Sequence, residues 1–500
     1  MLRVSARGGW GTRIVGIRGV STVPLGLALW LLSLGGMASS PGAHHPNQVL
    51  VMPLRRECAS GLERFQADRG VRVRGVFSRL GGLQVVRLAE GESVSRAIAA
   101  YRESGLVAYA EPDHVVSAVS VLPDDPYFQN GTLWWLSNYG QNGGLPDADL
   151  DMPEAWDVVS AATNVVVAVV DSGIRATHED LQGSLWRNPE DGTPGFNALT
   201  GQHDPWDDNG HGTHLAGVIA AVANNQRGVA GVAGRAQLMA CKFLDAAGNG
   251  YVSDAVACIE FARMHGAHII NLSWGGSEFS EAMSNALEVA RRDGVLVAAA
   301  AGNNAANSDW IPYYPAGIAL DHIVSVGAST RTDDRWTFSN HGAESVDLFA
   351  PGAAIYSTLA DGDAAYGTLS GTSQAAACVA GALALLRQQE PGAAPRALID
   401  RLLAAVDARP AFAGRCVAGG RLNVRKAVDL PRLSLASRAA PLRWSLSGRP
   451  GHRYQVAAST NLVEWHTLDS ATLGASGEWE FEDAASAVFP LRFYRGAPGP

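Results

Sequence analysis

The chain has 500 residues, which at about 150 residues per domain suggests roughly three domains. Hydrophobic residues make up 47% of the sequence and charged residues 17%, so the chain can bury a large core and is not disordered. The formal net charge is −9 and no basic run stands out, which argues against a nucleic-acid binder. The first 121 residues nevertheless hold 14 arginines and eight acidic residues, so a basic leader precedes an acidic body.

The first 38 residues have the layout of a secretory signal. Arginines precede a ten-residue apolar stretch, Leu25–Leu34, and small residues follow up to Ala38 and beyond. The alternative is a membrane anchor, but a helix that spans a bilayer needs about 20 apolar residues. We expect a signal peptide over 1–38, and a mature chain that is secreted or extracytoplasmic without a stable membrane span.

Residues 39–121 are predicted to form a small α+β unit. Strand and helix patterns alternate in the order β-α-β-β-α-β, which is typical of a split βαβ sandwich. The recognised segments are residues 48–52, 61–69, 82–88, 93–104 and 107–116. The segment Leu122–Pro126 combines two prolines with two aspartates, so we expect a linker there.

Residues 122–430 show a different pattern. Apolar runs that suit strands buried on both faces alternate with helical stretches, which predicts a parallel sheet covered by helices on both sides. The runs are residues 164–170, 267–272, 295–301 and 322–326, and the helical stretches are 211–223, 253–263 and 280–292. In such a three-layer α/β fold, active sites collect at the carboxyl ends of the strands.

Three polar residues occur at such positions. Asp171 directly follows an apolar run, while His211 and Ser373 each open a helical stretch. A serine hydroxyl needs a base to become a nucleophile, and the base needs an acceptor that orients it. Small residues surround all three side chains, so a substrate backbone can approach closely. The pattern predicts an Asp-His-Ser constellation for nucleophilic catalysis.

Each residue also has a simpler interpretation. Asp171 could accept hydrogen bonds in a turn, His211 and His214 could be a metal pair, and Ser373 could cap its helix. These readings do not explain why glycines cluster at all three sites. Ser373 also lacks the Gly-x-Ser-x-Gly elbow of α/β-hydrolases, because residue 375 is alanine.

The three motifs together resemble the subtilisin-like serine proteases. They read Asp171-Ser-Gly, Gly210-His-Gly-Thr-His and Ser370-Gly-Thr-Ser, in the order Asp, His, Ser, and the resemblance extends over Asp124–Leu430. The unit before them resembles the inhibitory propeptide of that family, with Tyr109-Ala-Glu-Pro-Asp as its end. The resemblance implies a secreted serine endopeptidase that is made as a zymogen, is inhibited by its own propeptide and hydrolyses protein or peptide substrates through an acyl-enzyme.

The resemblance also assigns an oxyanion donor and a substrate cleft. Asn303 would donate its side-chain amide to the oxyanion, beside the backbone N–H of Ser373; the simpler reading of Asn303 is a turn residue. Tyr313 falls near the floor of the pocket before the scissile bond, where its bulk would narrow that pocket. The expected substrate-binding residues are Ser273, Trp274, Gly275, Ala300, Ala301 and Gly302, of which Trp274 could equally be ordinary packing.

A structural calcium site is implied as well. Asp180 and Asn225 would offer side-chain oxygens, and Ala223, Arg227 and Val229 would offer carbonyl oxygens, which are the ligands that Ca²⁺ prefers. The alternative is an asparagine-rich turn without a metal.

The helix after Ser373 departs from the family pattern. Gln374 stands where methionine is common, and Ala377 and Cys378 replace the usual proline and histidine. We expect altered packing without loss of chemistry, with Cys378 a possible source of thiol sensitivity. The five cysteines contain no Cys-x-x-Cys pair, which excludes a zinc ribbon or a thioredoxin motif. The sequence leaves open whether the four that lie in the body pair or stay free.

Residues 431–500 lack helical periodicity and read as short strands between turns, so we expect an appended β-sandwich. Two other functions stay open for the whole chain. One is a non-catalytic binding protein that keeps the fold, and the other is an esterase that uses the same residues.

Overall fold

The structure is a computed structural model of the full chain. It describes residues 44–54, 59–89, 91–114, 122–429, 431–437, 441–448, 451–461, 464–474, 476–489 and 492–498. The predicted signal peptide, Cys58 and residues 115–121 at the end of the predicted propeptide lie outside these residues, whereas the predicted linker Leu122–Pro126 lies within them. Contacts divide the chain into two compact units, Met1–Val119 and Ser120–Pro500.

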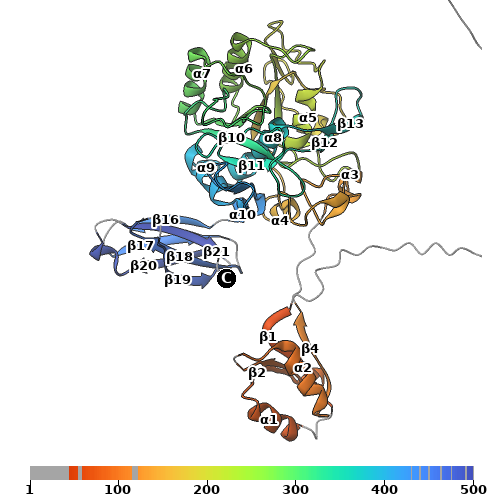
Figure 1. The fold of residues 1–500 in the computed structure, drawn as a ribbon, viewed down its shortest axis with the longest axis vertical. Helices are drawn as coiled ribbons and strands as arrows, with labels where there is room; N and C mark the ends of the chain where they lie inside the picture. The colour runs from red at the N-terminus through yellow and green to blue at the C-terminus, as the bar shows by residue number, and fades with distance from the viewer. Residues whose placement is uncertain are drawn as a thin grey trace, which may run out of the picture. The chain divides into compact units, whose positions relative to one another are not determined.

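The first unit is an antiparallel sheet with two helices (Figure 1). The strand order is β2-β3-β1-β4, and the elements follow one another as β-α-β-β-α-β, as predicted. Its core contains Val49, Val86, Ile98 and Tyr101, from strands and helix together. The elements are β1 (His44–Pro53), α1 (Ala59–Asp68), β2 (Arg72–Phe77), β3 (Leu83–Arg87), α2 (Val94–Glu103) and β4 (Val107–His114).

A nine-stranded sheet organises the second unit. The strand order is β14-β15-β11-β10-β9-β8-β5-β7-β6, and every pair is parallel except the short β14–β15 pair. The strands are β5 (Val166–Asp171), β6 (Gly195–Asn197), β7 (Gln237–Lys242), β8 (Ile269–Leu272), β9 (Leu296–Ala300), β10 (Ile323–Ser329), β11 (Leu348–Pro351), β14 (Asp407–Ala408) and β15 (Gly420–Arg421). A separate hairpin pairs β12 (Ile355–Thr358) with β13 (Tyr366–Leu369).

Helices cover both faces of this sheet, so the predicted three-layer α/β architecture is confirmed (Figure 1). Alternate residues of β5 show the division between the two cores. Val167 and Val169 join the core under α5 (His211–Ala220) and α8 (Thr372–Gln389). Val166 and Val170 join the core under α6 (Val252–Met264) and α7 (Glu281–Arg292). The helices are α3 (Pro126–Gln129), α4 (Met152–Trp156), α5 (His211–Ala220), α6 (Val252–Met264), α7 (Glu281–Arg292), α8 (Thr372–Gln389), α9 (Pro395–Ala404) and α10 (Val424–Asp429).

The tail forms two three-stranded antiparallel sheets, as the expected β-sandwich requires. Their orders are β16-β17-β20 and β19-β18-β21, and Leu446, Tyr454, Val456 and Phe481 fill the core between them. The strands are β16 (Arg432–Ser437), β17 (Leu442–Ser447), β18 (Arg453–Ser459), β19 (His466–Thr472), β20 (Glu478–Asp483) and β21 (Phe493–Pro498).

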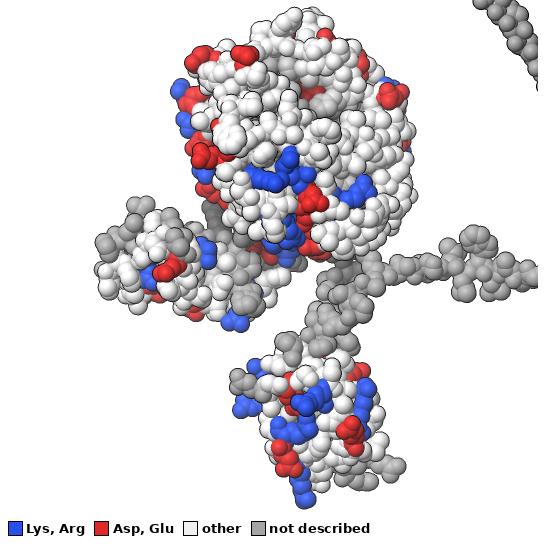
Figure 2. Space-filling model, viewed as in Figure 1, with Lys and Arg blue, Asp and Glu red and all other residues white. Residues whose placement is uncertain are grey.

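The surface agrees with the composition. On the face in view, Figure 2 shows a mostly uncharged body of the large domain, with basic and acidic side chains in small, mixed groups. Among the helices that the structure describes, none is long and apolar enough to cross a bilayer.

Candidate active site

Asp171 is the last residue of β5, and its side chain is fully buried. Its Oδ1 accepts hydrogen bonds from His211 Nδ1 at 2.8 Å and from the Ser172 N–H at 2.8 Å. The other oxygen, Oδ2, is buried without a partner. The carboxylate therefore fixes the imidazole through one nitrogen, and His211 Nε2 is left without a hydrogen bond to any described residue.

His211 opens α5, and its side chain is 27% exposed. Gly210 precedes it with φ 101°, a conformation that favours glycine. Gly212 follows it, and a Cβ there would lie 2.2 Å from the Gly173 carbonyl oxygen. The glycines on both sides of His211 therefore let the helix start against the loop that follows β5, which brings the imidazole to Asp171.

The charge of His211 is also set by Asp171. Burial opposes the protonated ring, but the negative charge of Asp171 and the hydrogen bond to it outweigh burial and raise the pKa of His211. The imidazolium that would form during proton transfer is thus stabilised in place.

A second buried carboxylate, Asp207, holds the loop between β5 and α5. Its Oδ1 accepts from Ser172 Oγ at 2.9 Å and from the Gly210 N–H at 2.8 Å, and its Oδ2 accepts from Thr213 Oγ1 at 2.6 Å. Ser172 Oγ in turn accepts from the Gly212 N–H at 2.9 Å. Asp207 was not among the functional residues predicted from the sequence. Its place four residues before His211, with glycine between them, is the signal that could have found it.

Ser373 is the second residue of α8 and is 7% exposed. Its hydroxyl donates to the Ser273 carbonyl at 2.9 Å, and the Ser273 hydroxyl donates back to the Ser373 carbonyl at 2.9 Å. No hydrogen bond joins Ser373 to His211 in the described chain. The two serines thus bond to each other, and the Ser373 hydroxyl donates to the Ser273 carbonyl instead of to the imidazole.

Asn303 lies three residues beyond the end of β9 and is exposed. Its Oδ1 accepts from the Thr372 N–H and from Thr372 Oγ1, both at 2.9 Å, which leaves the amide Nδ2 free to donate. A Cβ built on Gly371 would lie 3.3 Å from Asn303 Nδ2 and 3.6 Å from the Ser373 nitrogen. Asn303 Nδ2 and the Ser373 N–H therefore border the same small space. The Ser373 N–H lies in the first turn of α8, where backbone N–H groups have no partner within the helix.

The predicted substrate strand continues from β8. In the described chain, neither the N–H nor the carbonyl of Gly275 makes a hydrogen bond, so this backbone can still pair with an extended peptide. Trp274 is anchored: its Nε1 donates to the Val170 carbonyl at 2.8 Å, and its ring packs on Phe243 at a centroid distance of 4.7 Å. Packing and cleft lining are thus compatible roles for Trp274.

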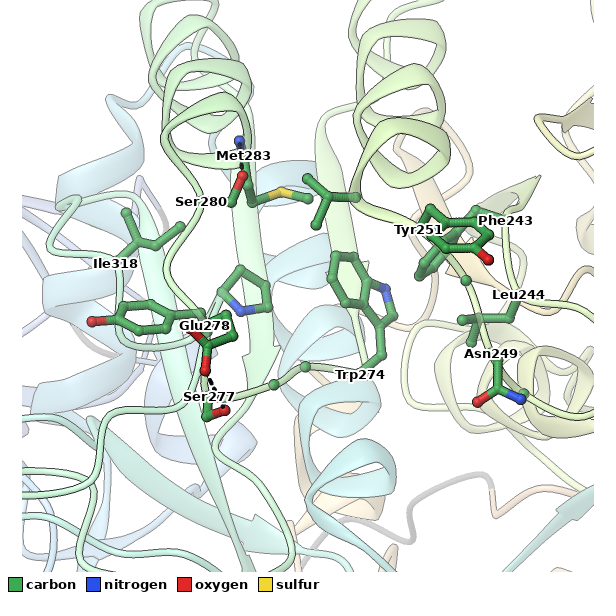
Figure 3. A pocket seen from close by; sticks show the side chains of 17 residues that line it. Phe243, Leu244, Asn249, Tyr251, Trp274, Ser277, Glu278, Ser280, Met283 and Ile318 are labelled. Atoms are coloured by element: carbon green, nitrogen blue, oxygen red, sulfur yellow. Dashed lines mark hydrogen bonds between the residues drawn. The ribbon is translucent and has the colours of Figure 1, made fainter.

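A cavity of about 470 Å³ opens beside this strand. Figure 3 shows Trp274 between two groups of side chains, with Phe243, Leu244 and Tyr251 on one side and Met283 and Ile318 on the other. The lining is mainly apolar, so it suits a hydrophobic side chain.

The second predicted wall of the substrate cleft follows β9. Ala300 is the last residue of β9, and Ala301 and Gly302 continue it; both alanines are buried. The Ala301 N–H donates to the Val326 carbonyl at 3.0 Å, and the Gly302 N–H donates to Thr372 Oγ1 at 3.1 Å. These bonds fix the wall against β10 and against the start of α8.

The predicted calcium residues come together around one loop. Asp180, which is fully buried, accepts from Asn225 Nδ2 at 2.7 Å, from the Val229 N–H at 2.8 Å and from the Tyr366 hydroxyl at 2.9 Å. Asn225 thus turns its nitrogen toward Asp180 and its oxygen toward the Arg227 N–H, at 2.8 Å.

Several oxygens at this loop nevertheless lack partners. The carbonyls of Ala223, Arg227 and Val229 accept no hydrogen bond in the described chain. Asp125, which was not among the predicted calcium ligands, is fully buried with its Oδ1 unpartnered. Burial, with a contribution from the negative charge of Asp180, raises the pKa of Asp125 to about 6. Two neighbouring buried carboxylates and three free carbonyls fit a hard cation.

Two alternatives left open by the sequence concern a metal pair of His211 with His214 and the state of the cysteines. The described residues contain no cluster of three His, Cys, Asp or Glu side chains that could hold a metal, and His214 Nε2 instead contacts the Ile355 carbonyl at 3.1 Å. The four cysteines of the body are free and buried. Burial raises the pKa of the Cys378 thiol, so the thiol sensitivity considered from the sequence is disfavoured.

The Subtilase family matches residues 162–419, and the fervidolysin N-terminal prodomain matches residues 37–113. A thermophilic serine proteinase of Bacillus sp. (strain AK1) is 36% identical over 305 residues, which cover 61% of this chain and 68% of that protein. Thermitase of Thermoactinomyces vulgaris is 35% identical over 308 residues, which cover 61% of this chain and 99% of that protein.

Solved structures agree with these matches. A protease of Pseudoalteromonas arctica PAMC 21717 aligns with a TM-score of 0.53 and 31% identity, over 61% of this chain and 98% of that one. The fold and the similar proteins together define a serine-type peptidase with a subtilisin-like catalytic domain. The chain belongs to the subtilase family, and an N-terminal prodomain precedes its catalytic domain.

Proposed function

We propose that the protein is a secreted serine endopeptidase in which Asp171, His211 and Ser373 are the catalytic triad and Asn303 completes the oxyanion hole. The observation that carries this proposal is the 2.8 Å hydrogen bond from His211 Nδ1 to a buried carboxylate, at the same sheet edge as two free donors. A base that is oriented in this way has its other nitrogen available for a serine hydroxyl.

The reaction begins with a change of partner for Ser373. Rotation about its Cα–Cβ bond moves the hydroxyl from the Ser273 carbonyl to His211 Nε2, which takes the proton as Oγ attacks the peptide carbonyl. The negative oxygen of the tetrahedral intermediate is stabilised by Asn303 Nδ2 and by the Ser373 N–H. His211 then protonates the leaving amine, and it deprotonates the water that hydrolyses the acyl-enzyme.

We propose four regions for the chain: a signal peptide over 1–38, a propeptide over 39–121, the peptidase domain over 122–430 and a β-sandwich over 431–500. The propeptide would occupy the cleft until the enzyme cleaves itself near residues 117–124. The apolar cavity beside Trp274 would receive a hydrophobic side chain of the substrate, several residues before the scissile bond.

Replacement of the nucleophile tests self-processing. We expect the Ser373→Ala protein to keep its propeptide, because it lacks the hydroxyl proposed to form the acyl-enzyme, whereas the wild-type protein loses it. Gel electrophoresis and N-terminal sequencing of the secreted product measure this. Ser370→Ala is the matched control: Ser370 is exposed and lies three residues before Ser373, and this variant should be processed normally. Normal processing and casein cleavage by the Ser373→Ala protein would contradict the proposal.

The pH dependence should follow the ionisation of His211. Because only the neutral imidazole can accept the Ser373 proton, kcat/KM should rise with pH through a pKa above the usual value of about 6.5. Asp171→Asn removes the charge that raises this pKa, so the transition should move to lower pH, and kcat should fall by about 10⁴-fold.

The ionisation can be measured without turnover. NMR titration of His211 in the Ser373→Ala background, with and without Asp171→Asn, reports the pKa directly. An unchanged His211 pKa after removal of the carboxylate would contradict the role given to Asp171.

We also propose a structural calcium site at the loop of Asn225. Asp125 and Asp180 would hold Ca²⁺ together with the carbonyls of Ala223, Arg227 and Val229, and Asn225 would join them by turning its amide oxygen inward. The ion would neutralise two buried carboxylates that otherwise repel each other.

Removal of calcium should therefore lower the thermal stability. At a free Ca²⁺ concentration 100 times the Kd, binding stabilises the folded state by about 2.7 kcal/mol, and EDTA removes that stabilisation. Calorimetry with and without EDTA measures the loss, which Asp125→Asn should largely abolish. Glu281→Gln, an exposed carboxylate at the start of α7, is the control and should keep the full EDTA effect. A melting temperature that EDTA leaves unchanged would remove the site from this account.

A further inference from the structure

The site defines where the substrate side chain nearest to the scissile bond must go. The Ser373 hydroxyl lies 2.9 Å from the Ser273 carbonyl, and Asn303 faces the space in front of the Ser373 N–H. The carbonyl that is attacked therefore sits between the chain that continues β8 and the chain that continues β9. The side chain of that residue must enter between these two segments, near Gly275 and Gly302.

An aromatic ring already spans this space. A Cβ built on Gly275 would lie 2.5 Å from Cε1 of Tyr313, and a Cβ built on Gly302 would lie 3.0 Å from Cγ of the same ring. The edge of the Tyr313 ring from Cε1 to Cγ thus runs from the segment that follows β8 to the segment that follows β9. The contact at Gly275 requires the absence of a side chain there, because real Cβ atoms essentially never come within 3.0 Å of another heavy atom, and the contact at Gly302 lies at that limit. Tyr313 occupies the room that the two glycines leave.

The backbone that carries the ring is fixed on both sides. The Tyr314 N–H donates to the Gly276 carbonyl at 2.8 Å, and the Gly276 N–H donates back to the Tyr314 carbonyl at 2.9 Å. The Tyr313 carbonyl accepts from the Gly317 N–H at 2.7 Å. Because these bonds tie the residue next to Tyr313 to the substrate strand itself, the ring cannot leave the space by a simple shift of the loop.

The ring is also retained by its own environment. Tyr313 is half-buried, and burial is the cause that raises the pKa of its hydroxyl. Beside Gly302, Asn340 donates from Nδ2 to the Ala301 carbonyl at 2.9 Å, and its N–H donates to the Gly302 carbonyl at 2.8 Å. The backbone of Ala301 and Gly302, which borders the ring, is therefore held as well, and it cannot move away from the ring without breaking these hydrogen bonds.

From these contacts we infer that Tyr313 is a specificity-determining residue that closes the pocket before the scissile bond, so that the enzyme cleaves after glycine, alanine or serine and rejects large side chains. This inference rests on the proposed function of Ser373 and its neighbours. The substrate class is then a peptide with a small residue at the cleavage site and a hydrophobic residue further toward its amino end, in the cavity beside Trp274.

Peptide p-nitroanilides that differ only in the last residue test the inference. The wild-type enzyme should hydrolyse the alanine substrate with a kcat/KM at least about tenfold above the leucine and phenylalanine substrates, since misfit of a few methylene groups costs at least that factor. Tyr313→Gly and Tyr313→Ala should reverse the order by opening the pocket. Tyr313→Phe keeps the ring and should keep the preference for alanine. Melting temperatures of all three variants show whether each is folded.

The outcomes separate two kinds of failure. Labelling of Ser373 by a fluorophosphonate and hydrolysis of any peptide substrate test the proposed function. If the enzyme is labelled but cleaves after phenylalanine as fast as after alanine, the ring moves aside and this inference is wrong while the proposed function stands. If neither labelling nor hydrolysis occurs in the processed wild-type protein, the proposed function fails first. If Tyr313→Gly is folded and active with an unchanged preference, another residue closes the pocket and the inference is likewise overturned.

Discussion

The whole site depends on one property of the parallel sheet: neighbouring strands end at the same edge. β9, β8 and β5 are adjacent in the sheet, and the residues proposed to act in catalysis or binding follow their carboxyl ends. Asp171 ends β5, Ser273 follows β8, and Asn303 follows β9. Helices α5 and α8 begin at this edge and deliver His211 and Ser373. Residues up to 202 positions apart in the chain lie at this edge because the strands end there and the two helices begin there.

Hydrogen bonds then restrict each functional side chain to one orientation. Asp171 holds the imidazole, Thr372 holds the Asn303 amide by its oxygen, and the two serines hold each other. Such preorganisation matters because donors that are already aimed at a developing charge need no rearrangement during the reaction. The Ser373 hydroxyl is the exception, since it changes its acceptor before it can attack. That change costs one hydrogen bond to the Ser273 carbonyl and gains one to the base.

Much of the architecture could be predicted from the sequence because the signals are local. Apolar runs such as residues 164–170 are long enough to identify buried strands, and the glycine-flanked motifs of His211 and Ser373 identify helix starts at a strand edge. The split βαβ order of the first unit, the three-layer sheet and the strands of the tail were expected and are confirmed.

The features that the sequence did not reveal depend on contacts between distant segments. Asp207 bonds to both sides of the His211 motif, and Asp125 is a lone buried carboxylate whose neighbour Asp180 is 55 residues away. The rotamer of Ser373 depends on a carbonyl 100 residues earlier. Tyr313 could be placed near the pocket floor, but its position across two glycines required coordinates. None of these contacts leaves a periodic pattern in the sequence.

The most direct measurement is a crystal structure of the processed protein after reaction with a fluorophosphonate. The account predicts one covalent bond, from Ser373 Oγ to phosphorus, with the phosphoryl oxygen about 2.7–3.1 Å from both Asn303 Nδ2 and the Ser373 nitrogen. His211 Nε2 should then face Oγ while Nδ1 keeps its bond to Asp171. A label on another residue, or a phosphoryl oxygen that points away from Asn303, would contradict the central claim.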